Sequence, residues 1–125
     1  VGHYGCGGVQ AVLNEASFGL IDNWLRHVGD VKEKHIEQLN ALPEKERLNS
    51  LIELNVIEQV RNVCRTNIVQ DAWAKGQELT IHGWVYGLAN GHLNDLESVV
   101  TCAEEANETY GIAVKRVFER VAEKS

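Results

Sequence analysis

The sequence of 125 residues is poor in cysteine and proline, contains no methionine and has no long apolar run. Its three cysteines are an odd number at unrelated spacings, which argues against a disulfide framework and favours a reducing compartment, so we expect a cytoplasmic protein. No stretch approaches the roughly 18–20 apolar residues that span a bilayer. No charged-then-apolar leader opens the sequence. We therefore expect no membrane partner and no secretory signal.

Basic residues are fewer than acidic ones. The sequence has 12 Lys and Arg and 18 Asp and Glu, which give a formal net charge of −6. A nucleic-acid binder needs a basic patch that releases counterions, so we expect no nucleic-acid partner. Hydrophobic residues make up 44% of the sequence and charged residues 24%, a composition that excludes a disordered chain. The length suits a single domain over residues 1–125.

Glycine is concentrated at the start, where residues 1–9 have the sequence VGHYGCGGV. Glycine permits close backbone approach and positive φ, so this density indicates a tight turn that leads into a helix over 8–16. In an α/β protein a buried strand normally precedes such a turn, and only Val1 stands before it here. We therefore expect the sequence to begin inside a domain.

Helical patterns account for much of the remaining sequence. A second helix is predicted to open within 19–25, with Asp22 or Asn23 as its cap, and to continue to Leu39 after a break at Gly29. A helix from Pro43 to about Cys64 has the strongest pattern, and its wide apolar stripe indicates burial in a core or a subunit interface. The stripe consists of Leu48, Leu51, Ile52, Leu54, Val56, Ile57, Val60, Val63 and Cys64. Shorter patterns predict helices over 67–75 and from about 103 to 123.

Residues 79–96 change to the alternation that is typical of strands. A strand over 79–86, a turn at Asn90-Gly91 and a returning strand over 92–96 form a predicted hairpin, followed by an extended or irregular segment over 99–102. His82, Trp84 and Tyr86 share one strand face, which we interpret first as a packing surface. A single hairpin is a small sheet for five or six helices.

His3 and Cys6 form an H-x-x-C pair in the glycine-rich turn. Imidazole and thiolate are both zinc ligands, and the two-residue spacer lets both reach one ion. The free N–H groups at the start of the following helix favour a thiolate. The alternative is a buried cysteine beside a solvent-facing histidine. A phosphate-binding loop is disfavoured because Gly8 stands where the P-loop lysine belongs. His27 and His35 are interpreted as surface residues of helices.

Four segments, in order, resemble the β-class carbonic anhydrases, most closely their bacterial-type branch. They are VGHYGCGGV at 1–9, GLIDNWL at 19–25, ELNVIEQV at 53–60 and HGWVY at 82–86. The resemblance implies an α/β fold, a parallel sheet flanked by helices, of which this chain holds mainly the helical C-terminal portion and a β-hairpin. It also implies an enzyme, a lyase that converts CO2 and water reversibly to bicarbonate and a proton.

Site residues follow from the resemblance position by position. His3 and Cys6 match two ligands of a catalytic Zn2+, and Gly7 and Gly8 match the backbone turn beside the metal and the substrate. Tyr86 matches a tyrosine that lines a bicarbonate pocket in part of the family. The resemblance implies Zn2+ as cofactor, CO2 and bicarbonate as ligands, and a homodimer or tetramer. It assigns no catalytic residue to this chain beyond the two metal ligands.

The first zinc motif of that family, C-x-D-x-R, does not occur in these 125 residues. It supplies the other cysteine ligand together with an aspartate and an arginine. We therefore expect residues 1–125 to be the C-terminal part of a carbonic anhydrase domain, with little hydratase activity alone. One alternative is a non-catalytic zinc-binding or assembly module derived from the same fold. Another is a small α-helical interaction domain in which the H-x-x-C pair arises by chance.

Overall fold

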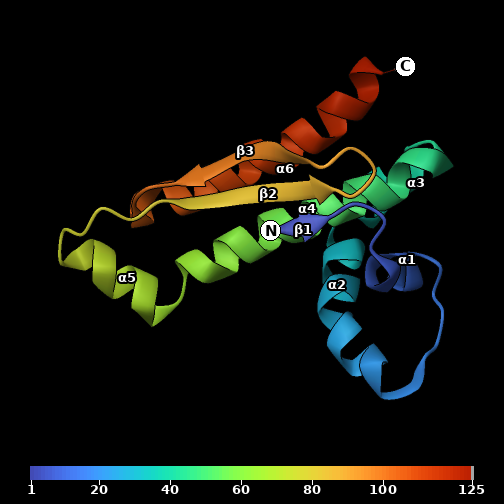
Figure 1. The fold of residues 1–125 in the computed structure, drawn as a ribbon, viewed down its shortest axis with the longest axis horizontal. Coiled ribbons are helices and arrows are strands. Elements are labelled where there is room, and N and C mark those ends of the chain that lie inside the picture. Colours follow the sequence, from blue (N-terminus) through green and yellow to red (C-terminus); the bar gives the residue numbers. More distant parts are fainter. Residues whose placement is uncertain (125) are drawn as a thin grey trace.

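The predicted hairpin forms the largest part of a three-stranded sheet in the computed structural model, which describes residues 1–124 (Figure 1). Strand β2 (Ile81–Gly87) pairs antiparallel with β3 (His92–Val100). The turn closes as expected, because Gly91 adopts a φ of 72° and its N–H donates to the Gly87 carbonyl at 2.8 Å. The structure thus confirms the hairpin.

Strand β3 extends to Val100, beyond the end that the alternation predicted. The register shifts opposite Gly83 and Trp84, where Ser98 and Asp95 are the successive partners on β3. Glu97, at a φ of 58°, lies within this bulge. The extra residues interrupt the alternation of apolar and polar side chains, so the sequence pattern ended the strand too early.

The third strand, β1 (Gly2–His3), lies parallel to β2 at one edge of the sheet. Gly2 pairs with Val85 and His3 pairs with Tyr86. A Cβ added at Gly2 would lie 2.6 Å from Cγ2 of Val56, so a glycine is needed where this strand meets the helix beneath it. A two-residue strand at the edge of the sheet therefore stands at the start of the glycine-rich turn, where a buried strand normally precedes such a turn.

Helix α4 (Glu44–Cys64) packs against the sheet and confirms the strongest helical prediction. Pro43 is its N-cap and precedes the first turn by one residue. The apolar stripe lies in the core of the chain, with Leu51, Leu54 and Ile57 at most 1% exposed. Most of the stripe is thus buried in the core of this chain, one of the two locations expected for it. Val63 departs from the prediction and is 42% exposed.

The N-terminal helices partly follow their predicted bounds. Helix α1 (Gly7–Leu13) is confirmed, and a short 3-10 turn, η1 (Gly19–Ile21), leads into α2 (Asp22–Lys34). Ile21, and neither Asp22 nor Asn23, is the N-cap; the Asp22 carboxylate instead accepts from the Phe18 N–H at 3.1 Å. This side chain therefore stabilises the turn that precedes the helix.

The predicted break at Gly29 is wrong, because α2 runs through that residue to Lys34, with His35 as its C-cap. A glycine inside a helix costs only about 1 kcal/mol relative to alanine, which packing on either side can offset. Helix α3 (Ile36–Ala41) follows directly. His35 was interpreted as a surface residue but is only 8% exposed, because it is enclosed between these helices and α6 (Ala106–Glu123).

The C-terminal helices agree with the sequence patterns. Helix α5 (Asn67–Ala74) ends before Gly76, which adopts a φ of 76°, and Thr66 caps its start. A 3-10 turn, η2 (Ala103–Glu105), precedes α6. Helix α6 packs against α4 and β3, and its buried side chains are Ala113, Val117 and Val121.

Helices α4 and α6 lie behind the hairpin in Figure 1 and pack on one face of the sheet. Val85, Leu96 and Val100 point into the core from that face. The chain is thus an α/β fold with a small sheet and mainly helical surroundings, as expected. No helix within residues 1–124 is both long enough and apolar enough to span a membrane.

Candidate metal centre

The two predicted metal ligands lie in one short turn between β1 and α1. His3 is the last residue of β1, and Cys6 is the N-cap of α1. Between them, Gly5 adopts a φ of 72°, a conformation that favours glycine and reverses the chain direction. The H-x-x-C spacing therefore places both side chains at the same end of strand β1.

Tyr4 fixes the imidazole of His3 through its backbone. Nδ1 of His3 lies 3.0 Å from the Tyr4 carbonyl oxygen. A carbonyl oxygen only accepts, so Nδ1 carries the proton in this contact. With Nδ1 engaged by the Tyr4 carbonyl, Nε2 is the ring nitrogen that could ligate a metal, an arrangement that metal-binding histidines use.

Cys6 has a half-exposed side chain at the start of α1. Its carbonyl accepts from the Gln10 N–H at 3.0 Å, so its backbone is held by the helix. Within the described chain its sulfur makes no capping hydrogen bond to that helix. The thiol therefore remains available to a ligand, although the shortness of α1 limits what the helix end contributes to a thiolate.

The two glycines after Cys6 have different surroundings. A Cβ at Gly8 would lie 3.1 Å from Cδ2 of Leu25 and 3.9 Å from Sγ of Cys6, so Gly8 allows α1 to approach α2. A Cβ at Gly7 would meet no described atom within 4 Å. Gly7 thus leaves open space beside the two candidate ligands.

Histidine and cysteine are suitable donors for zinc, but they supply only two of the four positions that a tetrahedral ion requires. Among residues 1–124, no three His, Cys, Asp or Glu side chains are grouped so that they could hold a metal ion. Cys64 is fully buried beside Val60 and Val100, and burial raises the pKa of its thiol. The donor types therefore fit zinc, and the described chain provides half of the set.

A polar network beneath the turn was not found by sequence reasoning. The Tyr4 hydroxyl donates to Oε2 of Glu53 at 2.8 Å and accepts from Nδ2 of Asn94 at 2.7 Å. Nη2 of Arg120 lies 3.4 Å from Oε1 of Glu53. Burial is the main cause that raises the pKa of Tyr4, to about 12. The hydrogen bond from Asn94 acts in the opposite direction, and the Glu53 carboxylate adds to the increase. The phenol therefore stays protonated at neutral pH and can donate to Glu53.

Tyr86 lies beside His3 in the parallel register of β1 and β2. Its carbonyl accepts from the Tyr4 N–H at 2.9 Å, and its side chain is 37% exposed. Tyr86 shares the sheet face away from α4 with His82 and Trp84, as predicted. The ring centroids of His82 and Trp84 lie 5.4 Å apart. The structure therefore brings Tyr86 close to one candidate ligand.

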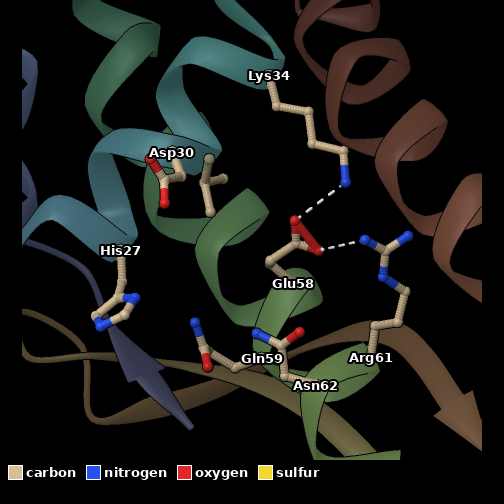
Figure 2. A pocket seen from close by; sticks show the side chains of 8 residues that line it. His27, Asp30, Lys34, Glu58, Gln59, Arg61 and Asn62 are labelled. Atoms are coloured by element: carbon tan, nitrogen blue, oxygen red, sulfur yellow. Dashed lines mark hydrogen bonds and ion pairs between the residues drawn. The ribbon is translucent and has the colours of Figure 1, made fainter. Parts of the chain in front are cut away.

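A second polar site lies between α2 and α4, where a cavity of about 520 Å³ is lined by the side chains drawn in Figure 2. Glu58 occupies its centre, with Nζ of Lys34 3.1 Å from Oε1 and Nη2 of Arg61 3.3 Å from Oε2. The two cations also lie over the ring of Tyr110, at 4.7 and 4.0 Å. One carboxylate thus bridges two cations from α2 and α4, so the cavity wall is a junction between helices. His27, also on this wall, is exposed as predicted.

Comparison with known proteins gives a consistent result. The family model described as carbonic anhydrase matches residues 1–93. The chain is 45% identical to a carbonic anhydrase of Emericella nidulans over 96 residues, which covers 76% of this chain and 42% of that protein. A Coccomyxa β-carbonic anhydrase, solved with acetazolamide, superposes with a TM-score of 0.77 at 37% identity, covering 86% of this chain and 49% of that one.

One of two tetrameric β-carbonic anhydrases from Sordaria macrospora superposes with a TM-score of 0.71 at 29% identity. The match covers 80% of this chain and 51% of that chain. The chain therefore spans about half the length of the proteins it matches.

Proposed function

Because the chain belongs to the β-class carbonic anhydrases, we propose that its protein catalyses the reversible hydration of CO2 to bicarbonate and a proton. The observation that supports this most directly is that His3 and Cys6 lie in one short turn between β1 and α1, with Nδ1 of His3 engaged by the Tyr4 carbonyl. Residues 1–125 then form part of a larger catalytic domain, because the chain spans about half the length of its relatives.

His3, through Nε2, and Cys6, through Sγ, are the residues that would hold Zn2+. When bound, zinc supplies a Lewis acid that lowers the pKa of a coordinated water to about 7. The Tyr4 carbonyl keeps the His3 ring in the required tautomer. Gly7 and Gly8 form the backbone turn beside the metal, and the open space at Gly7 leaves room for a small substrate such as CO2.

This chain alone is expected to bind zinc weakly and to hydrate CO2 poorly. Structural zinc sites with a full ligand set bind with roughly 10–16 kcal/mol, and a pair of ligands retains only a fraction of that. The remaining donors would come from residues beyond this chain or from another subunit. We expect a homodimer or tetramer, which the tetrameric relative supports.

Two further assignments are part of the proposal. Tyr86 lines a bicarbonate pocket, which is supported by its partly exposed position beside His3. The protein functions in the cytoplasm, which is supported by three cysteines that are all free thiols.

The test compares the natural protein with its His3→Ala and Cys6→Ser variants. We expect about one zinc per active site in the natural protein by elemental analysis, and CO2 hydration in stopped-flow measurements. Both variants should lose zinc and activity while keeping the circular dichroism spectrum of the folded protein. Full zinc content and full activity in both variants would contradict the assignment and favour a chance H-x-x-C pair.

The second candidate, a non-catalytic zinc-binding or assembly module, is favoured by one observation. The described residues contain no third donor grouped with His3 and Cys6. Stoichiometric zinc that is lost in Cys6→Ser, combined with no CO2 hydration by the natural protein, would support this candidate over the enzyme.

A further inference from the structure

Tyr4 stands between the two candidate ligands and is held at three points. Its N–H donates to the Tyr86 carbonyl at 2.9 Å, and its own carbonyl accepts from Nδ1 of His3 at 3.0 Å. Its hydroxyl forms the third attachment, within the polar network. The backbone atoms of Tyr4 therefore set the direction of the His3 ring, and the side chain determines where those atoms lie.

The backbone alone does not fix this turn. Gly5, with a φ of 72° and no described atom within 4 Å of an added Cβ, follows Tyr4 directly. Glycine has the largest conformational freedom of any residue, so the path from Tyr4 to Cys6 needs an external anchor. β1 is an edge strand of two residues, and its sheet hydrogen bonds to β2 come from one side.

The anchor is the Tyr4 hydroxyl, whose donor and acceptor capacities are both used. It donates to Glu53 on α4 and accepts from Asn94 on β3, while Arg120 on α6 approaches the second oxygen of Glu53. The Glu53 side chain is only 12% exposed, so its position is fixed by packing as well as by charge. Two elements distant in sequence thus contact one phenol in this turn directly, and a third, α6, reaches it through Glu53.

We propose that Tyr4 is a positioning residue that, through its hydroxyl and Glu53, holds His3 and Cys6 in the geometry that binds zinc. This inference rests on the proposed ligand role of His3 and Cys6. Groups that orient metal ligands affect metal affinity by roughly 10- to 100-fold when they are removed. Glu53 therefore controls a metal site that it does not touch.

The experiment measures the zinc dissociation constant of the natural protein by competition with a chelator, at a temperature at which each variant is folded by circular dichroism. Tyr4→Phe keeps the ring and removes the anchor, and should weaken zinc binding by roughly 10- to 100-fold. Asn94→Ala, at an exposed strand position where folding is not threatened, should weaken it in the same direction. Glu53→Ala should resemble Tyr4→Phe.

Two further variants separate positioning from general stability. Glu53→Gln keeps an oxygen that can accept from the Tyr4 hydroxyl, so it should retain an affinity close to that of the natural protein. Tyr110→Phe removes an equivalent hydroxyl that lies 3.5 Å from Nε2 of His35, and should leave zinc affinity unchanged. An affinity loss of equal size in Tyr110→Phe would show that the effect is one of stability and would overturn the proposal.

Cys6→Ser distinguishes the two levels of inference. If this variant loses zinc while Tyr4→Phe, Glu53→Ala and Asn94→Ala all bind as tightly as the natural protein, the ligand assignment stands and the positioning role of Tyr4 is wrong. If Cys6→Ser and His3→Ala both retain zinc, the ligand assignment fails, and the role of Tyr4 fails with it.

Discussion

Gly2 and Val56 are so close that a Cβ on Gly2 would lie 2.6 Å from the Cγ2 methyl of Val56. Strand β1 therefore packs closely on helix α4, with only the Val56 side chain between the two backbones. His3 follows Gly2 in the strand, so the distance between β1 and α4 also determines where the first candidate ligand lies. The packing of Gly2 against Val56 is thus coupled to the turn that holds the two candidate ligands.

Gly2→Ala is expected to lower stability by about 1–3 kcal/mol, the usual cost of forcing an extra methyl into a packed site. Thermal unfolding measures the loss, and zinc content should fall with it because β1 moves. Gly29→Ala is the matched control, since an added Cβ inside α2 meets no atom of residues 1–124 within 4 Å. That variant should gain roughly 0.5–1 kcal/mol from helix propensity. Equal stability of the two variants would contradict this account of Gly2.

Because His35 is buried, we expect the free energy of unfolding to fall when the pH is lowered. Burial first, and then the charge of Lys34, lowers the pKa of His35 below its usual value, while Glu58 opposes this shift. The unfolded chain therefore takes up the proton at a higher pH than the folded chain. The contribution of His35 to the free energy of unfolding should be complete above about pH 6.5, the pKa of an unperturbed histidine. It should be lost as the pH falls from this value to the pKa of His35 in the folded chain.

Denaturant unfolding between pH 7.5 and 5.5 measures this dependence. His35→Gln should flatten the slope in that interval, whereas His27→Gln, at an exposed position, should leave it unchanged. A slope that is the same in the natural protein and in His35→Gln would show that other groups cause the acid sensitivity.

Glu58→Gln is expected to destabilise the junction between α2 and α4 by about 1–3 kcal/mol. The substitution leaves the cations of Lys34 and Arg61 without their shared carboxylate in a partly buried site. Glu119→Gln breaks a pair with Lys115 in which both side chains are exposed, so its effect should stay below about 0.5 kcal/mol. The unfolding midpoints of the two variants provide the comparison, and similar shifts would argue against a special role for Glu58.

The three thiols should differ in reactivity. Burial raises the pKa of Cys64, and its side chain is inaccessible, so it should react with a thiol reagent only on unfolding. Cys6 and Cys102 are partly exposed and should react quickly in the metal-free protein. Zinc should protect Cys6 and leave Cys102 reactive, which mass spectrometry of labelled peptides can determine. Protection of Cys102 by zinc, with Cys6 unprotected, would place the metal elsewhere.

Long periodic elements were predictable from the sequence because many residues contribute to one pattern. Helix α4 combines apolar residues at helical spacing with a proline just before its start, and its bounds were predicted almost to the residue. The hairpin turn was predicted equally well, because few residues besides glycine adopt the φ observed at Gly91. These elements follow from local sequence alone.

Features decided by tertiary packing were not predictable in this way. Strand β1 has two residues, too few for a period, and the bulge at Glu97 concealed the second half of β3. The break between α2 and α3 falls at His35, whose ring packs against Phe118, and not at Gly29, where the low helix propensity of glycine predicted it. The contact between Tyr4 and Glu53 joins residues 49 positions apart and leaves no spacing signal. The candidate ligand pair was recognisable from the sequence because both members lie in one turn.

Helix α4 passes through two separate apolar clusters, the main core around Leu51, Leu54 and Ile57 and a smaller one of Val60, Cys64 and Val100. Its two ends are therefore expected to behave as different cooperative units in hydrogen exchange. Amides near Leu54 should exchange only when the whole molecule opens, whereas those near Cys64 should exchange through local fraying together with α5. Heat or denaturant would then disrupt the α5 end of this helix before the main core.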